Sequence, residues 1–164
     1  MTNLKEQIIA ISKEIGISKI GFTTADNFDY LEKSLRLSQE KGTNSGFEHQ
    51  NIEERIKPKL LLDNAKTIIS IAVAYPNKLP QLPGKSPYKR GKFSSSSWGV
   101  DYHTILTEKM ARLSERIAEL TDDFDHKAMV DTGALVDTAV ARRAGIGFIG
   151  KNGLVISKEY GSYM

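Results

Sequence analysis

The sequence predicts an α/β (α+β) fold with a single central mixed β-sheet flanked by helices. Three observations predict this fold class. Segments with the apolar spacing of amphipathic helices alternate with short β-branched segments typical of strands. The 164 residues are 40% hydrophobic and 26% charged, which suits one globular domain. No internal repeat interrupts the alternation. We therefore expect one sheet in one domain over residues 1–164.

The first half of the chain is expected to form two helices and two strands. Apolar residues recur every three or four positions between Leu4 and Ile15, which predicts a helix that Gly16 ends. A short strand is expected at 18–24 and a second helix at 28–41. Residues 67–75 (TIISIAVAY) are almost wholly apolar and rich in β-branched side chains. This pattern predicts a strand buried on both faces.

The second half is expected to alternate in the same way after an irregular stretch. Residues 76–97 hold four of the five prolines and form that stretch. The elements expected after it are a helix at 101–120, a strand at 127–130, a helix at 133–144, a glycine-rich turn at 145–153 and a strand at 154–157.

The composition excludes several kinds of site. The chain has no cysteine, which excludes disulfides, thiolate zinc sites, cysteine nucleophiles and iron–sulfur ligation within these residues. Its longest apolar run is far shorter than the ~20 residues that a membrane span needs. Residues 1–15 carry charge and lack a signal-peptide core. We therefore expect a soluble cytoplasmic protein with no membrane partner. The net charge of +3 permits a nucleic-acid partner without indicating one.

The glycine-rich turn matches two phosphate-binding motifs in part. Gly145, Gly147 and Gly150 fit the G-x-G-x-x-G string, while Gly145, Gly150 and Lys151 fit most of a phosphate loop. In the second motif Asn152 replaces the Ser or Thr that binds magnesium, and both motifs need a strand before the glycines and a helix after them. Gly145 is instead expected to end the preceding helix in a left-handed conformation. The glycine density still lets backbone approach a ligand closely, so this turn is a candidate ligand wall.

The start of the long predicted helix carries Trp98, Asp101, Tyr102 and His103. For Asp101 the favoured interpretation is helix capping, with Trp98 packing just before the helix. Tyr102 and His103 can also line a pocket. Histidine is the side chain best suited to proton transfer near neutral pH.

Asp131 follows the apolar residues 128–130 and precedes Thr132, Gly133 and a predicted helix. One interpretation is again a helix cap. The other is a carboxylate at the carboxyl end of a strand, where α/β sheets place their ligand sites. Partial burial there would raise the pKa of the carboxyl and let it hold a proton for donation. The residues alone leave both interpretations open.

A basic segment and two isolated histidines complete the candidates. A run of cations beside aromatic residues is typical of a solvated loop, and it can also bind nucleic-acid phosphates while the aromatics stack on bases. His49 and His126 stand alone, and without cysteine or an H-x-x-x-H pattern no metal site built from protein ligands is expected. The basic segment contains Lys85, Tyr88, Lys89, Arg90, Lys92 and Phe93.

Three longer segments together carry a family resemblance. They are NIEERIKPKLLLDNAKTIISIAVAYP (51–76), SWGVDYH (97–103) and MVDTGALVDTAVARRAGIGFIGKNGLVIS (129–157). With SKIGFTTAD (18–26) before them, they resemble, in order, the N-terminal half of epoxyqueuosine reductase. The resemblance covers nearly the whole chain. It implies that residues 1–164 are an N-terminal cobalamin-binding catalytic domain without the C-terminal ferredoxin-like domain of the family.

The resemblance implies a function and its cofactors. The family's reaction is the reduction of epoxyqueuosine to queuosine at the wobble position of tRNA, the last step of queuosine biosynthesis. The implied cofactor is base-off cobalamin, held in a domain of nitroreductase-like or cobalamin-processing architecture, as in the related reductive dehalogenases. Two [4Fe–4S] clusters are implied only for the absent domain. The implied partners are the tRNA anticodon stem-loop and an external electron donor that acts through that domain, and a monomer is expected.

The resemblance also implies roles for particular residues. Asp131 matches the family's proton donor, and it is also expected beside the cobalamin. The remaining positions are expected to contact or lie beside the cofactor, and they are Arg55, Ser94, Tyr102, His103, Lys151, Asn152 and Val155.

Two other interpretations stay open. A non-catalytic cobalamin- or tRNA-binding module would agree with the absence of a redox centre in this chain. A flavin-binding, nitroreductase-like enzyme would agree with the expected architecture. If the chain is a truncated reductase, we expect it to be inactive without the electron-transfer domain.

Overall fold

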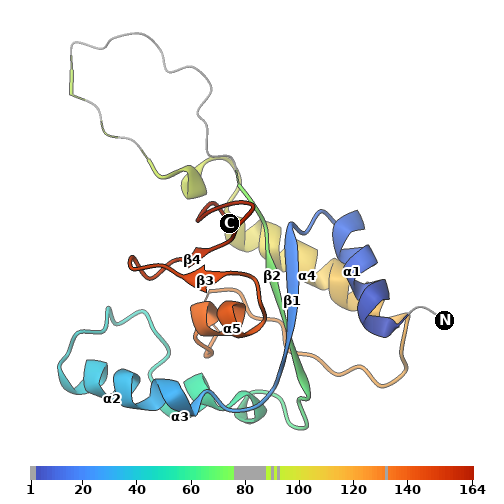
Figure 1. Ribbon diagram of the computed structural model, residues 1–164, viewed down its shortest axis with the longest axis horizontal. Helices are drawn as coiled ribbons and strands as arrows, with labels where there is room; N and C mark the ends of the chain where they lie inside the picture. The colour runs from blue at the N-terminus through green and yellow to red at the C-terminus, as the bar shows by residue number, and fades with distance from the viewer. Residues whose placement is uncertain (1–2, 76–87, 90, 92, 132) are drawn as a thin grey trace.

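A computed structural model describes all residues except 1–2, 76–87, 90, 92 and 132. The first half of the chain contains two strands among helices of up to 11 residues, and the second half contains the 17-residue helix α4, the shorter α5 and a small hairpin (Figure 1). The elements are α1 (Leu4–Glu14), β1 (Lys19–Thr24), η1 (Asp29–Leu31), α2 (Glu32–Glu40), α3 (Ile52–Ile56), η2 (Pro58–Leu60), β2 (Thr67–Ala72), η3 (Ser95–Ser97), α4 (Tyr102–Ala118), α5 (Asp137–Arg143), β3 (Phe148–Ile149) and β4 (Val155–Ile156).

The described strands form two small antiparallel sheets, so the prediction of a single mixed sheet is wrong. β1 pairs with β2 from Lys19 opposite Ala72 to Thr24 opposite Thr67. β3 pairs with β4 as a separate hairpin. The broader α/β prediction is confirmed, because helices cover both faces of the β1–β2 sheet (Figure 1).

One face of the β1–β2 sheet packs against α1 and α4. Ile20 and Phe22 of β1 alternate toward this face, and Ile69 and Ile71 of β2 join them. They pack against a cluster whose α1 side is formed by Ile8, Ile11 and Ile15, and the spacing of three and four residues places these on one face of a helix. The same spacing made this helix predictable from the sequence. The buried members of this core are Ile8, Ile11, Ile15, Ile17, Leu113 and Ile117.

The opposite face packs against α3, α5 and the segment before α5. Phe28 and Ile56 are each 1% exposed and form the centre of this second core. Leu135, Ala139 and Val140 complete its buried part. This packing places the start of α5 close to the sheet and so positions the segment that carries Asp131.

The helix predictions hold best where capping signals are strong. Asn3 accepts a hydrogen bond from the Lys5 backbone at the start of α1, and Gly16 follows its end with φ +78°. Asp101 caps α4 by accepting from the His103 backbone at 2.9 Å, as expected. Gly145 follows α5 with φ +79°, also as expected.

Three local predictions are wrong. Residues 127–130 form no strand, although they precede Asp131 as an irregular segment. The helix expected at 133–144 begins only at Asp137, and the helix expected at 28–41 begins with the 3-10 turn η1 and becomes α-helical at Glu32. β2 ends at Ala72, and none of its residues is fully buried.

No helix in the described part of the chain combines the length and the apolar character needed to cross a membrane.

Candidate active site

Asp131 lies in an irregular segment between the two cores. Its backbone adopts φ +54°, a left-handed conformation that a non-glycine residue holds only where its surroundings favour it. Its side chain is 60% exposed, so the expectation of partial burial is wrong. The capping interpretation is also wrong, because α5 begins at Asp137 and Val136 occupies its N-cap without a side-chain bond.

Two side chains at the start of α4 reach Asp131. The Tyr102 hydroxyl donates to Asp131 Oδ2 at 3.3 Å, and His103 Nε2 lies 3.3 Å from the same oxygen. The two rings stack on each other with their centroids 4.1 Å apart. The structure thus brings together three residues that the family resemblance singled out, although Tyr102 and His103 precede Asp131 by 29 and 28 residues in sequence.

Asp101 fixes the orientation of His103. Its Oδ1 atom accepts from the His103 backbone at 2.9 Å and lies 2.8 Å from His103 Nδ1. The hydrogen bond that Asp101 accepts from the ring is the largest factor that raises the pKa of His103, and Asp131 adds to it. In return, the two bonds from His103 lower the pKa of Asp101. Asp101 is therefore both a helix cap and a partner of the histidine ring.

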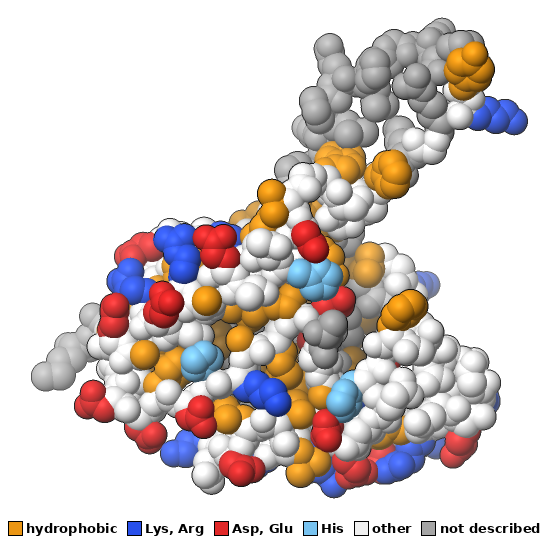
Figure 2. Space-filling view, turned by 180° about the vertical axis from the view of Figure 1, so that it is seen from behind, with side chains coloured by type: hydrophobic (Ala, Val, Ile, Leu, Met, Phe, Trp, Pro, Cys, Tyr) orange, Lys and Arg blue, Asp and Glu red, His pale blue; other side chains and the backbone are white. Residues whose placement is uncertain are grey.

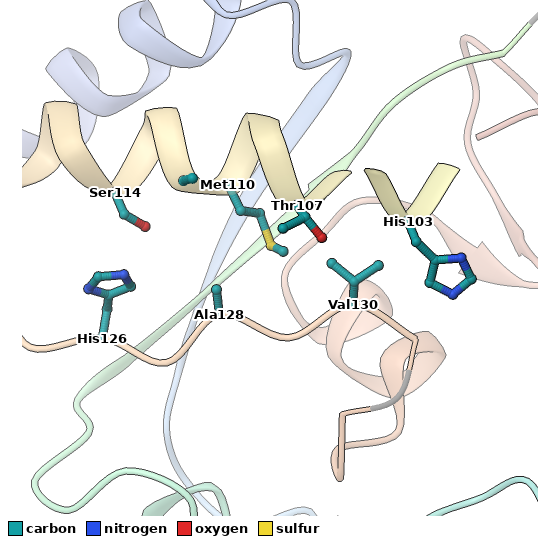
Figure 3. Close-up of a pocket in the computed structure, with 8 residues that line it drawn as sticks. His103, Thr107, Met110, Ser114, His126, Ala128 and Val130 are labelled. Carbon is teal, nitrogen blue, oxygen red and sulfur yellow. The ribbon is translucent and has the colours of Figure 1, made fainter. Parts of the chain in front are cut away.

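A pocket of about 400 Å³ opens beside this cluster, between α4 and residues 126–130 (Figure 3). His103 stands at one end of it and His126 at the other (Figure 3). Figure 2 shows the molecule from behind, where hydrophobic side chains are visible in a central hollow among charged and histidine side chains. The pocket is lined by His103, Thr107, Met110, Ala111, Ser114, His126, Ala128 and Val130.

Asp137 is a functional candidate that the sequence argument missed. Burial among protein atoms, followed by the negative charge of Asp131, raises the pKa of Asp137 to about 6. The residue still keeps exposed surface. Its position in the middle of a helix expected at 133–144 concealed it. A second aspartate six residues after Asp131 in the VDTGALVD string was the available signal.

The other candidate cofactor residues lie on separate elements. Arg55 is half-buried in α3, Ser94 is exposed just before η3, and Val155 is partly exposed in β4. Lys151 and Asn152 are exposed in the turn between β3 and β4. In Figure 1, α3, η3 and the β3–β4 hairpin lie on the opposite side of the β1–β2 sheet from α1. Among the described residues, none of these five forms a hydrogen bond or an ion pair with Asp131.

The β3–β4 hairpin exposes large apolar side chains. Phe148 is 60% exposed and Leu154 is 51% exposed. A Cβ atom at Gly147 would collide with the backbone carbonyl of Ile156, so this glycine is needed for the hairpin's own packing, whereas a Cβ atom at Gly150 would meet the side-chain ends of Ile156 and Asn152. Their role as a direct ligand wall stays a prediction. The exposed apolar surface is what a large flat ligand could cover.

Metal-ligating side chains and the basic segment form no binding site among the described residues. No group of three or more metal-ligating side chains comes together in that part of the chain. Lys85, Arg90 and Lys92 of the basic segment lie outside the described residues, while Tyr88 and Phe93 are 79% and 85% exposed.

Comparison with known proteins identifies the family to which the chain is related. Residues 55–132 match the protein-family model described as epoxyqueuosine reductase QueG, DUF1730. The curated epoxyqueuosine reductase of Lactococcus garvieae is 57% identical over 164 residues, which are all of this chain and 47% of that protein. The chain is related to the epoxyqueuosine reductases.

Solved structures of epoxyqueuosine reductases share the fold. The Streptococcus thermophilus structure is 70% identical with a TM-score of 0.94, and the match covers 99% of this chain and 44% of that one. An epoxyqueuosine reductase with an epoxyqueuosine-modified tRNA-Tyr stem loop is 50% identical with a TM-score of 0.92, covering 98% of this chain and 43% of that one. The chain therefore spans less than half the length of the epoxyqueuosine reductases that it matches.

Proposed function

We propose that this chain is the cobalamin-binding, catalytic part of an epoxyqueuosine reductase, which reduces epoxyqueuosine to queuosine at the wobble position of tRNA. The observation that carries the proposal is the convergence of Tyr102 and His103 on Asp131 beside a pocket. The names of the chain's relatives support the reaction. In this proposal residues 1–164 act as one unit with an electron-transfer domain that holds two [4Fe–4S] clusters and receives electrons from an external donor.

Asp131 is the proton donor in this proposal. Converting the epoxide to an alkene releases its oxygen as water and consumes two electrons and two protons. The oxygen therefore needs a proton as its bond to carbon breaks. Asp131 presents an exposed carboxyl group whose Oδ2 atom is held by Tyr102 and His103. A substrate that approaches the pocket can reach this group without any movement of the protein core.

The residues present are compatible with base-off cobalamin. The hairpin exposes Phe148 and Leu154 for contact with a flat macrocycle. The half-buried Arg55 has no ionic or side-chain hydrogen-bond partner among the described residues, so its guanidinium is free to bind a negative group of the cofactor. When bound, cobalamin supplies low-valent cobalt as the source of electrons. Further residues that would hold it are Ser94, Tyr102, His103, Asp131, Lys151, Asn152 and Val155.

The chain's own residues cannot supply thiolate ligands for iron–sulfur clusters, because it contains no cysteine. We therefore assign the two clusters of the proposal to a separate domain. The role of the present chain is then to bind the cofactor and the modified base, to orient the epoxide, and to deliver a proton from Asp131.

The anticodon stem-loop of tRNA is the proposed partner. The complex of a 50% identical reductase with a modified stem loop supports this assignment. The exposed aromatic rings of Tyr88 and Phe93 provide stacking surfaces for unpaired bases. The net charge of +3 favours approach to the phosphate backbone.

Binding of a tRNA stem-loop tests the proposed substrate. Fluorescence anisotropy would compare a stem-loop that carries epoxyqueuosine with the same stem-loop carrying guanosine at the wobble position. The proposal expects tighter binding of the modified RNA, and a decrease of affinity with salt that reports the number of phosphates contacted. Equal affinity for the two RNAs, or no binding by folded protein, would contradict it.

Substitution of Asp131 by asparagine tests the proposed acid. In the intact enzyme Asp131→Asn is expected to reduce turnover by about 100-fold or more, because loss of general acid catalysis has that magnitude. Cobalamin should stay bound, as judged from the visible spectrum. Asp122→Asn, an exposed carboxyl beyond the far end of α4, is the matched control. Unchanged turnover of Asp131→Asn would refute the acid role.

A non-catalytic binding module is the second candidate function. It is favoured by the absence of any cysteine, and hence of any thiolate-bound redox centre, in this chain. Reduction of epoxyqueuosine by cobalamin-loaded chain supplied with a strong chemical reductant would argue against it. Tight binding of the modified stem-loop without any product in that assay would favour it.

A further inference from the structure

The His103 ring has a carboxylate at each of its two nitrogens. Nδ1 lies 2.8 Å from Asp101 Oδ1, and Nε2 lies 3.3 Å from Asp131 Oδ2. A neutral imidazole carries one N–H, so it can donate to only one of two carboxylates. The imidazolium carries two N–H groups and satisfies both. The arrangement therefore selects the protonated ring whenever both carboxylates are charged.

The ring is held in this position from two further sides. Asp101 is anchored because the same oxygen also accepts from the His103 backbone at the start of α4. The Tyr102 ring stacks against the imidazole with an interplanar angle of 28°. Nε2 consequently points at Asp131 without help from a ligand. The side chain of His103 is 42% exposed, so water can reach it.

An acid that gives up a proton in each turnover must regain one before the next. We propose that His103 returns this proton to Asp131, and that Asp101 is the positioning residue that orients the ring and balances its charge. The inference rests on the proposed role of Asp131 as proton donor. In the step, the Nε2–H bond breaks, the Oδ2–H bond forms, and no electron moves. Water then restores the proton to His103.

The groups around His103 keep the ring protonated, so that a proton is held next to Asp131. Asp101, Asp131 and the phenol of Tyr102 are the titratable groups that contact the ring, and the charge of Asp131 acts in turn on the nearby carboxyl of Asp137. No lysine or arginine of the described residues forms an ion pair with Asp101 or Asp131. The negative surroundings raise the pKa of His103, so the ring can stay charged close to neutral pH.

Nuclear magnetic resonance of ¹⁵N-labelled histidines tests the proton sharing without any turnover. The chain has three histidines, and His103→Gln identifies the signal of His103. Its titration midpoint is expected to fall in Asp131→Asn and to fall further in Asp101→Asn, since Asp101 is the stronger influence. Asparagine keeps the capping ability at position 101 while removing the charge. Asp122→Asn should leave the midpoint unchanged. A midpoint that does not respond to Asp131→Asn would overturn the proposal.

Turnover of the intact enzyme separates proton return from a structural role. In His103→Gln, the first turnover of enzyme prepared at low pH should keep its rate, while the steady-state rate falls about tenfold or more. Added imidazole should restore the steady-state rate of His103→Ala and shift its pH profile. A first turnover that is slowed as much as the steady state, or no rescue by imidazole, would overturn the proposal. Absence of activity in the parent enzyme would contradict the proposed function, and the histidine titration would then decide the proton sharing alone.

Discussion

The guanidinium of Arg143 lies over the ring of Phe28, with its central carbon 3.4 Å from the ring centroid. Its N–H groups donate to Thr23 Oγ1 at 3.0 Å, to Thr24 O at 2.7 Å and to Asn27 O at 3.2 Å. One side chain near the end of α5 thus fastens this helix to the end of β1 and the following loop. Because α5 begins just after the Asp131 segment, this attachment helps to position the candidate site.

Replacement of Arg143 by lysine is expected to destabilise the protein. Lysine cannot reproduce the three donor directions or the flat contact with Phe28, so a loss of about 1–3 kcal/mol in the free energy of unfolding is expected. Urea denaturation followed by circular dichroism would measure it. Arg142→Lys is the control, because Arg142 is exposed and its side chain forms no hydrogen bond or ion pair with the described residues. Equal stabilities of the two variants would contradict this account of Arg143.

Gly21 of β1 is expected to tolerate no side chain. A Cβ atom at this position would collide with the carbonyl oxygen of Ala144, at the end of α5. Gly21→Ala should therefore lower the free energy of unfolding by about 1–3 kcal/mol, the cost of overpacking a close contact. Thermal denaturation would measure this change. Gly91→Ala is the control, since no described atom lies within 4 Å of a Cβ there. A Gly21→Ala variant as stable as the parent would mean that α5 does not approach β1 this closely.

Asp137 should make stability depend on pH between about 4 and 6. Its pKa in the folded protein is raised to about 6, so the folded state binds this proton more strongly than the unfolded state does. The contribution is stabilising below pH 4 and is lost as the pH rises through 6. Asp137→Asn should thus stabilise the protein at pH 7 by about 1 kcal/mol, a figure reduced for solvent screening, and change little at pH 4. Denaturation midpoints at the two pH values would measure this, and equal effects would contradict it.

Asp101 is expected to have two separable effects: its side chain caps α4, and its charge acts on His103. Asp101→Ala removes the helix cap and should cost about 1 kcal/mol of stability, while Asp101→Asn keeps the cap and should cost much less. Both variants remove the charge beside His103. Thermal denaturation of the pair therefore isolates the capping contribution. Equal losses in the two variants would show that the charge, and not the cap, supports this end of α4.

The helices with strong local signals could be predicted from the sequence. α1 carries a capping box at Asn3 and Glu6 and a left-handed glycine at its end. α4 begins at an aspartate cap and continues with a regular apolar stripe. These signals act within a few residues of each helix end, so a single sequence contains them.

Other features depend on packing between distant segments. Ala134 and Leu135 are buried although they lie in an irregular segment before α5. Their apolar side chains fit the pattern of a helix, which is why the sequence predicted an earlier start for α5. Residues 127–130 have the composition of a strand but pair with no described strand. The contact between His103 and Asp131 joins segments 28 residues apart, and only the family resemblance pointed to these two residues together.

Titration of this chain with cob(II)alamin tests directly whether it binds the cofactor on which the proposed function depends. Circular dichroism would first establish that the isolated chain is folded, and the visible spectrum would then follow binding. We expect a saturable spectral change characteristic of base-off cobalamin, with binding weakened about tenfold in Arg55→Ala by loss of a charge-assisted contact. A folded chain whose addition leaves the cob(II)alamin spectrum unchanged would contradict the assignment of this chain as the cobalamin-binding part of a reductase.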